Sequence, residues 1–381
     1  MSREVVIIEG ARTPFGRAQK GNLRQTRPED LAALAVKEAL RRAGLTAEQV
    51  EDLALGCAMP EGQQGLNVAR NVGFLAGLPD TVPAYTVNRF CASGLQSIAD
   101  VAARIALGQL ESGIGGGLES MTAVPMGGFH PQLHPGLAMD FPQAYIGMGT
   151  TAENVAARFG VSREDQDAFA YNSHRKASIA REKGLLAQEI IPVDTFVDGK
   201  AVRVEHDELI RPDTTIEGLK GLKPAFKPVG GTVTAGNSSP LTDGAAAVVL
   251  GTRDTAGKGT VLGVFKRFVT VGVDPAIMGI GPVPAIRKLL SQSGLTIADI
   301  DLFEINEAFA AQSVYCQREL GIPDEKLNVN GGAIALGHPL GVSGSRLVLT
   351  ALYELRRRGG GKAVVSMCIG GGMGAAALLE A

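Results

Sequence analysis

The sequence lacks an excess of charge, paired cysteines and long apolar runs. Its 37 Lys and Arg residues nearly balance its 39 Asp and Glu residues, so the formal net charge is −2 and nucleic acid is not expected as a main partner. None of the four cysteines belongs to a Cys-x-x-Cys pair, so we expect neither a zinc knuckle nor a redox motif, and no metal site. No apolar run is long enough to span a bilayer.

Targeting signals are also missing from the sequence. No secretory signal or Arg-rich presequence precedes the first strand-like run, MSREVVIIEG, and the last residues, LLEA, form no address tag. A reducing cytoplasm is therefore the expected location, in which free thiols remain available for chemistry. Tryptophan is absent, whereas glycine, at 50 residues, exceeds its average share and predicts many tight turns and close backbone approaches.

The length and composition indicate a globular enzyme with more than one core. A chain of 381 residues is too long for a single ordinary core. Apolar residues make up 45% and charged residues 20%, which is normal for a soluble globular enzyme. We expect two or three domains, or one duplicated fold.

An internal repeat favours duplication. The segment Glu38–Gly56 (EALRRAGLTAEQVEDLALG) resembles Ala285–Asn306 (AIRKLLSQSGLTIADIDLFEIN), because in both a helical pattern ends at Gly-Leu-Thr before a short turn and an apolar strand. Each half later presents a Gly-rich strand exit, at Ser112–Met121 and at Ser366–Leu379. Alternating helices and strands predict two α/β units that face each other and build one site between their related ends.

The first half is interrupted at about Met121 to Ser239. The interruption contains loops rich in Pro, Met and His, and then a strongly helical run that opens with Ser162 at the N-cap and Asp165 at the N3 position. It ends in a loop of small polar residues, GTVTAGNSSPLTDGAAA. An excursion of this kind usually supplies a lid or a binding surface to a scaffold.

Cys91 lies where an apolar strand, Val82–Val87, gives way to a helix that begins near Leu95. Unpaired N–H groups and the helix dipole favour an anion at such a terminus, so we expect a thiol with a lowered pKa that acts as a nucleophile. The small residues 92–94 permit a substrate to approach closely. From position alone, the alternative is a small buried apolar residue, which is the usual fate of a free cysteine.

Three further residues at loop and strand ends could carry chemistry. His338 lies in a loop that leads into a helix, at a place in the repeat that matches the neighbourhood of Cys91, and imidazole titrates near neutrality. Cys368 ends an apolar strand before three glycines, whose N–H groups could form an oxyanion hole; the alternative is a buried cysteine at a tight turn. Asn306 follows a strand and is interpreted first as a helix N-cap, with a water-holding or oxyanion-donating role as the alternative.

Several ordered motifs resemble those of the thiolase family across essentially the whole chain: ARTPFG, NRFCASGLQS, GTVTAGNSSPLTDGAAA, NEAFAAQ, GGAIALGHPLGVSGSR and CIGGGMGAA. The resemblance implies an α/β fold of duplicated βαβαβαββ halves, stacked in five αβαβα layers, with a loop domain inserted in the first half. The expected units are 1–120 with 240–256 as the N-terminal half, 121–239 as the inserted CoA-binding loop domain, and 257–381 as the C-terminal half.

The resemblance also implies a function, the thiolytic cleavage of a 3-ketoacyl-CoA with CoA in fatty acid β-oxidation. Cys91 is the implied nucleophile, which carries the acyl group as a thioester in a ping-pong reaction. Cys368 is the implied acid and base for the acetyl-CoA enolate and for CoA. His338 would activate Cys91 and, with a water held by Asn306, stabilise the enolate. Backbone N–H groups of Cys91 and Gly370 would form the oxyanion hole.

By the same resemblance, the insert binds CoA as a co-substrate and no cofactor is held permanently. Ser239 and Ala235 are expected to contact the pantetheine, and Met148 and Phe309 to line the tunnel. Gly147 stands where short-chain biosynthetic thiolases have a His, and the smaller residue predicts a longer acyl pocket. A homodimer packed through the first-half sheets, or a homotetramer, is implied, whereas a β-oxidation partner subunit cannot be read from the sequence.

Three alternative functions remain open at this point. An acetyl-CoA C-acetyltransferase, which makes acetoacetyl-CoA, belongs to the same family, although NRFCASGLQS with ESM and VPM nearby resembles 3-ketoacyl-CoA thiolases more closely. A decarboxylating ketoacyl synthase typically lacks a second cysteine before the glycine run, so Cys368 argues against it. A non-catalytic acyl-CoA-binding relative is expected to lose Cys91, His338 or Cys368, and all three are present.

Overall fold

The computed structural model describes residues 3–257 and 261–381. The predicted boundary between residues 256 and 257 therefore lies at the edge of the first described range, and residues 258–260, like residues 1–2, lie outside the described part. Within these two ranges, no helix is both long enough and apolar enough to cross a membrane.

The first half builds a half-sheet in the order β4–β3–β5–β8–β1. The pairs β4–β3 and β3–β5 are parallel, whereas β5–β8 and β8–β1 are antiparallel, and a short strand, β2, pairs with β8. The strands are β1 (Val6–Arg12), β2 (Gly16–Arg17), β3 (Leu53–Gly56), β4 (Ala84–Val87), β5 (Ser112–Ser120) and β8 (Thr242–Gly251).

The second half repeats this order as β10–β11–β12–β9. The pair β10–β11 is parallel and the pairs β11–β12 and β12–β9 are antiparallel, so the four strands match β3, β5, β8 and β1 and confirm the duplication. The half-sheets join edge to edge, because β1 pairs antiparallel with β9 at two positions. The strands are β9 (Gly263–Gly272), β10 (Leu302–Ile305), β11 (Lys362–Ile369) and β12 (Met373–Glu380).

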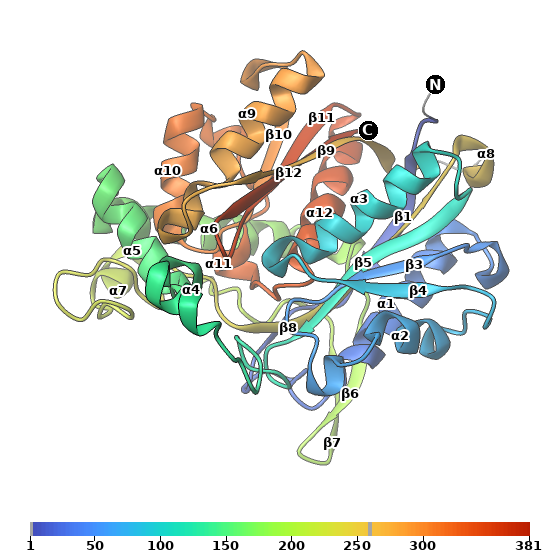
Figure 1. The fold of residues 1–381 in the computed structure, drawn as a ribbon, viewed down its shortest axis with the longest axis horizontal. Helices are drawn as coiled ribbons and strands as arrows, with labels where there is room; N and C mark the ends of the chain where they lie inside the picture. Colours follow the sequence, from blue (N-terminus) through green and yellow to red (C-terminus); the bar gives the residue numbers. More distant parts are fainter. Residues whose placement is uncertain (1–2, 258–260) are drawn as a thin grey trace.

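Helices form three layers around the two half-sheets, which gives the predicted αβαβα stack (Figure 1). In the centre, α3 packs on β5 and β3, α12 packs on β11 and β10, and the two helices contact each other. Helices α1 and α2 cover the outer face of the first half-sheet, and α9, with α10 beside it, covers the second. Their bounds are α1 (Pro28–Ala43), α2 (Val68–Ala76), α3 (Ser93–Ala106), α9 (Pro282–Ser293), α10 (Ala310–Leu320), α11 (Ala333–Leu336) and α12 (Ser343–Arg358); a short α8 (Arg253–Ala256) follows β8.

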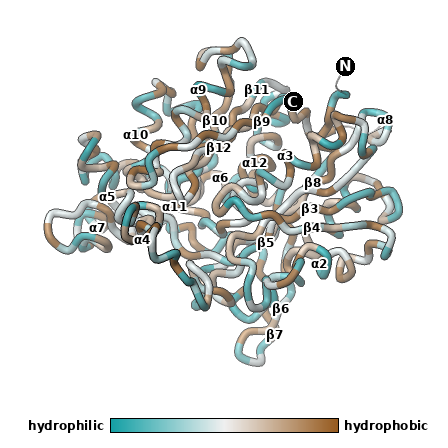
Figure 2. The backbone as a smooth tube through the Cα atoms, viewed as in Figure 1, coloured by the Kyte–Doolittle hydropathy of each residue, from teal (hydrophilic) through white to brown (hydrophobic). Residues whose placement is uncertain are grey.

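The core follows the same layers. One cluster of buried side chains, with Leu95 and Ile98 of α3 and Leu347 of α12, fills the space between the half-sheets. Two others lie under the outer helices of each half. In Figure 2 the hydrophilic segments lie mostly at the periphery, as expected when each sheet face is covered by an apolar helix stripe.

The repeated sequence gives repeated local structure. Helices α1 and α9 end at Gly44 and Gly294, each with φ of +67°, the left-handed conformation that favours glycine. In each half, a threonine then opens a 3₁₀ turn with a capping box, at Ala47–Gln49 and at Ile297–Asp299, before the strand begins.

The insert lies between β5 and β8, which are sheet neighbours. Ser162 and Asp165 form the predicted capping box, since Ser162 Oγ accepts from the Asp165 N–H and the Asp165 carboxylate accepts from the Ser162 N–H. The fully buried Arg12 of β1 fastens the insert through Glu189, at 2.7 Å, and Asp207, at 2.7 and 2.9 Å. The elements are α4 (Pro135–Asp140), α5 (Met148–Phe159), α6 (Arg163–Glu182), β6 (Val193–Val197), β7 (Lys200–Val204) and α7 (Ile216–Lys220).

Candidate active site

Cys91 lies in a 3₁₀ turn, Phe90–Ala92, immediately before α3. Phe90 adopts a φ of +44°, and Ser93 Oγ donates to the Phe90 carbonyl at 2.6 Å while it accepts from the Arg89 N–H at 2.8 Å. These bonds fix the turn that carries the thiol, whose residue is only 8% exposed. The predicted location at the start of a helix is therefore confirmed.

The predicted pKa of Cys91 is wrong for the resting site. Burial raises the pKa of the Cys91 thiol to about 11, because it penalises the thiolate. Hydrogen bonds from the backbone N–H groups of Gly370 and of Cys91 itself lower the pKa, but they do not compensate, and Glu119 raises it further. The stabilisation expected at the helix terminus is thus smaller than the cost of desolvation, and a base must take the proton before the sulfur can attack.

His338, in the loop between α11 and α12, is the buried imidazole of the site. Its Nδ1 lies 2.5 Å from Ser343 Oγ, and that hydroxyl donates to the Pro339 carbonyl at 3.1 Å. Because the hydroxyl proton is used on Pro339, His338 Nδ1–H donates to Ser343 and Nε2 keeps its lone pair. Burial, with the charge of Arg346 as a second cause, lowers the pKa of His338 to about 3, so the resting imidazole is neutral and is a weaker base than free imidazole.

Asn306 is fully buried and contacts this imidazole, with Nδ2 3.2 Å from His338 Nε2. The first interpretation as an N-cap is wrong, because α10 begins at Ala310 and its N-cap is Phe309. The Asn306 N–H donates to the Ser366 carbonyl at 2.9 Å, which ties the residue to β11, two residues before Cys368. Asn306 Oδ1 has no hydrogen-bond partner within the described residues, which leaves an acceptor beside the imidazole.

Cys368, the residue before the last of β11, is 1% exposed. Burial raises its pKa well above the ordinary value, and the nearby Cys91 and Cys316 raise it further. The turn Phe90–Ala92, which carries Cys91, contacts β11, so the two thiols lie on adjoining segments. A Cβ placed on the nearby Gly370 would lie 3.4 Å from Met148 Sδ and 3.8 Å from the Phe90 ring. Gly370 therefore lies beside both of these side chains.

Three of the four predicted CoA contacts lie near Cys368 and Gly370. Met148, Phe309 and Cys368 pack in one cluster of buried and half-buried side chains. Ser239 donates both its N–H, at 3.0 Å, and its Oγ, at 3.1 Å, to the carbonyl of the residue that precedes Phe309. Ala235, in contrast, lies exposed on the loop before it, outside that cluster.

The sequence reasoning missed polar residues that hold the site. Ser343 receives the Nδ1–H of His338, and Thr242 Oγ1 accepts from the His338 N–H at 3.1 Å. The buried Glu119 accepts from the Gly341 N–H at 2.8 Å and so ties the imidazole loop to the first half. All three residues lie inside or beside the sequence motifs, but nothing in their spacing marks them.

Two family models match the chain: the thiolase N-terminal domain over residues 5–254 and the thiolase C-terminal domain over residues 259–381. The chain is 53% identical over 392 residues to a 3-ketoacyl-CoA thiolase of Bacillus subtilis (strain 168), a match that covers 99% of each chain.

Solved structures agree with these sequence matches. A Bacillus anthracis acetyl-CoA acetyltransferase superposes with a TM-score of 0.92 at 39% identity, covering 100% of this chain and 99% of that one. The dimeric peroxisomal thiolase of Saccharomyces cerevisiae gives a TM-score of 0.91 at 41% identity, covering 99% of this chain and 97% of the other. Similarity of this extent includes both halves and the insert.

Proposed function

This chain belongs to the thiolase family, and we propose that it is an acetyl-CoA C-acyltransferase that cleaves 3-ketoacyl-CoA with CoA to acetyl-CoA and a shortened acyl-CoA. The observation that carries the proposal is a chain of contacts that ends at the other half: His338 contacts Asn306, Asn306 bonds to Ser366 of β11, and β11, which carries Cys368, contacts the turn of Cys91. A thiol, a neutral base and a second thiol suit acyl transfer through a thioester.

In the proposed first half-reaction, His338 Nε2 takes the proton of Cys91. The thiolate attacks the 3-keto carbon, and the tetrahedral oxyanion accepts hydrogen bonds from the N–H groups of Cys91 and Gly370; one such donor contributes about 3 kcal/mol. The Cα–Cβ bond of the substrate then breaks, which leaves an acyl thioester on Cys91 and the enolate of acetyl-CoA. The imidazolium of His338 and a water held by Asn306 stabilise the enolate oxygen, and the Cys368 thiol protonates its carbon.

In the second half-reaction, CoA enters and the Cys368 thiolate takes its thiol proton. The CoA thiolate attacks the thioester, and the shortened acyl-CoA leaves as the Cys91 thiolate recovers its proton from His338. Division into two steps at one sulfur avoids bringing two CoA species together at once. The raised pKa of Cys91, about 11, supports a base-dependent start rather than a preformed thiolate.

We assign the binding of CoA to the predicted loop domain, residues 121–239, with Ser239, Ala235, Met148 and Phe309 as contacts and no permanent cofactor. Met148 begins α5 directly after Gly147, an exposed N-cap whose built Cβ would meet only Thr150 Oγ1, at 4.0 Å. No side chain therefore blocks this position, which is in line with acyl chains longer than that of acetoacetyl-CoA.

A homo-oligomer and a cytoplasmic location complete the proposal. The edge strand β4 is only partly buried along its whole length, and such an edge suits pairing with a second copy, as a homodimer or a dimer of dimers. The dimeric yeast relative is in line with this. Four free cysteines suit a reducing compartment, although the yeast relative is peroxisomal. Light scattering tests the homo-oligomer, and cell fractionation tests the location.

The activity is tested with CoA and 3-ketoacyl-CoAs of four, eight and sixteen carbons, with the products resolved by mass spectrometry. We expect equal amounts of acetyl-CoA and of an acyl-CoA shortened by two carbons, with a higher kcat/KM for eight or more carbons than for four. A strong preference for the four-carbon substrate would identify an acetyl-CoA C-acetyltransferase instead. Absence of shortened product at every length would reject the proposal.

A further inference from the structure

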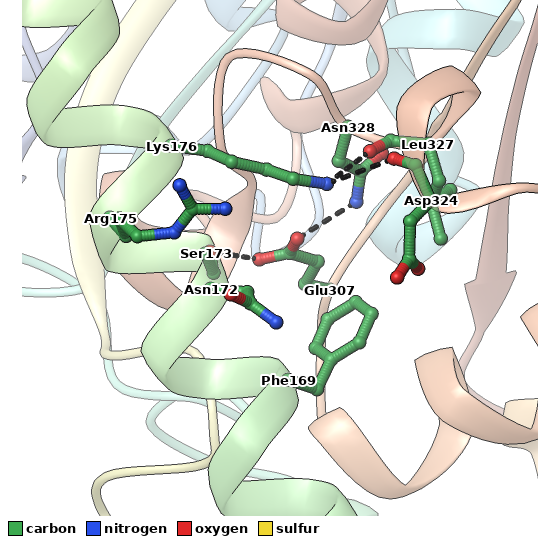
Figure 3. A pocket seen from close by; sticks show the side chains of 9 residues that line it. All are labelled: Phe169, Asn172, Ser173, Arg175, Lys176, Glu307, Asp324, Leu327 and Asn328. Carbon is green, nitrogen blue, oxygen red and sulfur yellow. Dashed lines mark hydrogen bonds between the residues drawn. The ribbon is translucent and has the colours of Figure 1, made fainter. Parts of the chain in front are cut away.

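A small pocket beside α6 contains a buried carboxylate that the proposed mechanism does not use. Figure 3 shows Glu307, 1% exposed, pointing from the loop after β10 towards α6. Its Oε2 accepts from Ser173 Oγ at 2.6 Å and from the Ile334 N–H at 3.2 Å, and its Oε1 accepts from Asn328 Nδ2 at 2.8 Å. One carboxylate therefore joins the insert, the start of α11 and the segment before α11.

Asn328 binds the residues on both sides of Asn306, through the backbone of Ile305 and the side chain of Glu307. Its Oδ1 accepts from the Ile305 N–H at 2.9 Å, and its Nδ2 donates to the Ile305 carbonyl and to Glu307, both at 2.8 Å. Ile305 and Glu307 flank Asn306, whose carboxamide contacts His338. Asn328 itself has a φ of +43°, a conformation that asparagine tolerates better than most residues.

The second carboxylate oxygen of Glu307, Oε2, binds the backbone close to His338 in the chain. The Ile334 N–H that it accepts from lies in the first turn of α11, and His338 follows shortly after this helix. A Cβ on Gly332, just before α11, would lie 2.2 Å from the Glu307 carboxyl carbon. Only glycine leaves room for the Glu307 carboxylate to lie this close to the backbone.

Helix α6, which belongs to the insert, binds both Glu307 and the segment that carries Asn328. Besides the bond from Ser173, Lys176 Nζ donates to the carbonyl of Leu327, directly before Asn328, at 2.8 Å, and to that of Asp324 at 3.2 Å (Figure 3). The helix thus anchors both the carboxylate and the segment that carries Asn328.

We propose that Glu307 and Asn328 are positioning residues, which hold the Asn306 carboxamide and the His338 loop in place, so that the imidazole and the water held by Asn306 meet the enolate oxygen. The inference rests on the proposed function, because it takes the roles of Asn306 and His338 from there. Neither positioning residue contacts the reacting atoms; each acts through Asn306 or through the helix before His338. Misplacement of a catalytic group by about 1 Å can lower the rate by a factor of about 100. Loss of one of these hydrogen bonds is therefore expected to have a large effect on kcat.

The first test is Glu307→Gln, which keeps the shape of the side chain but presents an NH₂ group to a donor. We expect kcat for thiolysis to fall about tenfold or more, while the KM for CoA stays within about twofold, because the substrate contacts are unchanged. The matched control is Ser173→Ala, which removes one donor and leaves those of Ile334 and Asn328; its kcat should fall less than about threefold.

A double-mutant cycle separates positioning from general stability. In the Asn306→Ala background, the target of the positioning is gone, so Glu307→Gln should lower kcat by less than about twofold. Should Glu307→Gln fail to fold, Asn328→Gly takes its place in the same cycle, because glycine adopts the positive φ and lacks the side chain.

The outcomes are distinct. A wild-type protein without thiolysis activity contradicts the proposed function itself. An active wild type in which the substitution lowers kcat by the same factor with and without Asn306 overturns the positioning role, and so does a loss confined to KM or to thermal stability. A loss of kcat that disappears in the Asn306→Ala background supports it.

Discussion

Strands β3 and β10 occupy the same position in the two halves, yet the matched residues at their carboxyl ends differ. Each follows a glycine-capped helix and a capped 3₁₀ turn, and each pairs parallel with the strand that leads to the site. Counted from Gly44 and Gly294, Gly56 of the first half matches Asn306 of the second. The first half therefore ends β3 with a residue that has no side chain, whereas the second half places a carboxamide directly after β10.

This difference determines how each catalytic group is held. A Cβ on Gly56 would lie 2.3 Å from the carbonyl carbon of Ser93, so the missing side chain lets the first turn of α3, with Cys91, lie directly against β3. In the second half, Asn306 contacts His338 instead. At this matched position, the helix of the nucleophile is placed by close backbone packing, and the base by a side-chain contact.

The comparison teaches what each half should tolerate. Added volume should harm the first half most, because a packed backbone has no room to adjust. Loss of a donor or acceptor should harm the second half most, because an unpaired buried polar group is costly. The four predictions below test this contrast, from the largest expected effect to the smallest.

Removal of the nucleophile gives the largest effect. We expect Cys91→Ala to lower kcat for thiolysis by about a thousandfold or more, since no other sulfur stands at the start of α3, while the circular dichroism spectrum is unchanged. The control is Cys57→Ala, a fully buried cysteine that follows Gly56; its kcat should stay within about twofold. An equal loss in both variants would mean that packing, not sulfur chemistry, accounts for the defect.

Removal of the base comes next. His338→Ala should lower the rate of Cys91 acylation by about 10²–10⁴-fold, which is the usual contribution of a general base. Because burial lowers the pKa of His338 to about 3, the wild-type imidazole stays neutral below its ordinary pKa of 6.5. Single-turnover acylation should therefore show no loss from imidazole protonation between about pH 7 and pH 5; a fall centred near pH 6.5 would contradict the assigned pKa.

Volume at the end of β3 tests the packing claim directly. Gly56→Ala should reduce the free energy of unfolding by about 1–3 kcal/mol, because the new methyl group overlaps the backbone at Ser93, and it should slow acylation by displacing Cys91. The control is Gly73→Ala in α2, where the nearest atom to the new Cβ is 3.5 Å away; it should be neutral or slightly stabilising. Urea unfolding measures both, and a neutral Gly56→Ala would refute close packing as the positioning device.

The smallest effects fall on the shared framework. Gly44→Ala and Gly294→Ala each place a side chain at φ of +67°, which costs about 1 kcal/mol. The new Cβ meets no atom within 4 Å at either position, so the two losses should be equal and kcat unchanged. A clear difference between the two substitutions in thermal unfolding would show that the halves are not equivalent even in their framework.

Much of the framework could be predicted from the sequence because it depends on local rules. The Gly-Leu-Thr repeat predicted matching caps and turns, and the Ser162–Asp165 pattern predicted the start of α6. The start of α3 beside Cys91 followed from apolar periodicity and small residues. These features need only neighbouring residues, which a sequence displays directly.

Other features depend on distant residues and could not be predicted in this way. Asn306 has the residue type of an N-cap, but the helix begins later and the carboxamide meets His338 instead. The pKa of Cys91 was expected to fall because the helix terminus is visible in the sequence, whereas the burial that raises it comes from packing between the halves. Ser343 fixes the imidazole tautomer, but the sequence does not distinguish it from the other small polar residues of its motif.

The central claim is that Cys91 carries the acyl group between two CoA molecules. The most direct measurement is intact-protein mass spectrometry, with peptide mapping, after brief exposure to an eight-carbon 3-ketoacyl-CoA without CoA. We predict one six-carbon acyl group on the peptide that contains Cys91, lost when CoA is added. An acyl group on Cys368 or elsewhere, or continued turnover without any acyl-protein, would contradict the claim.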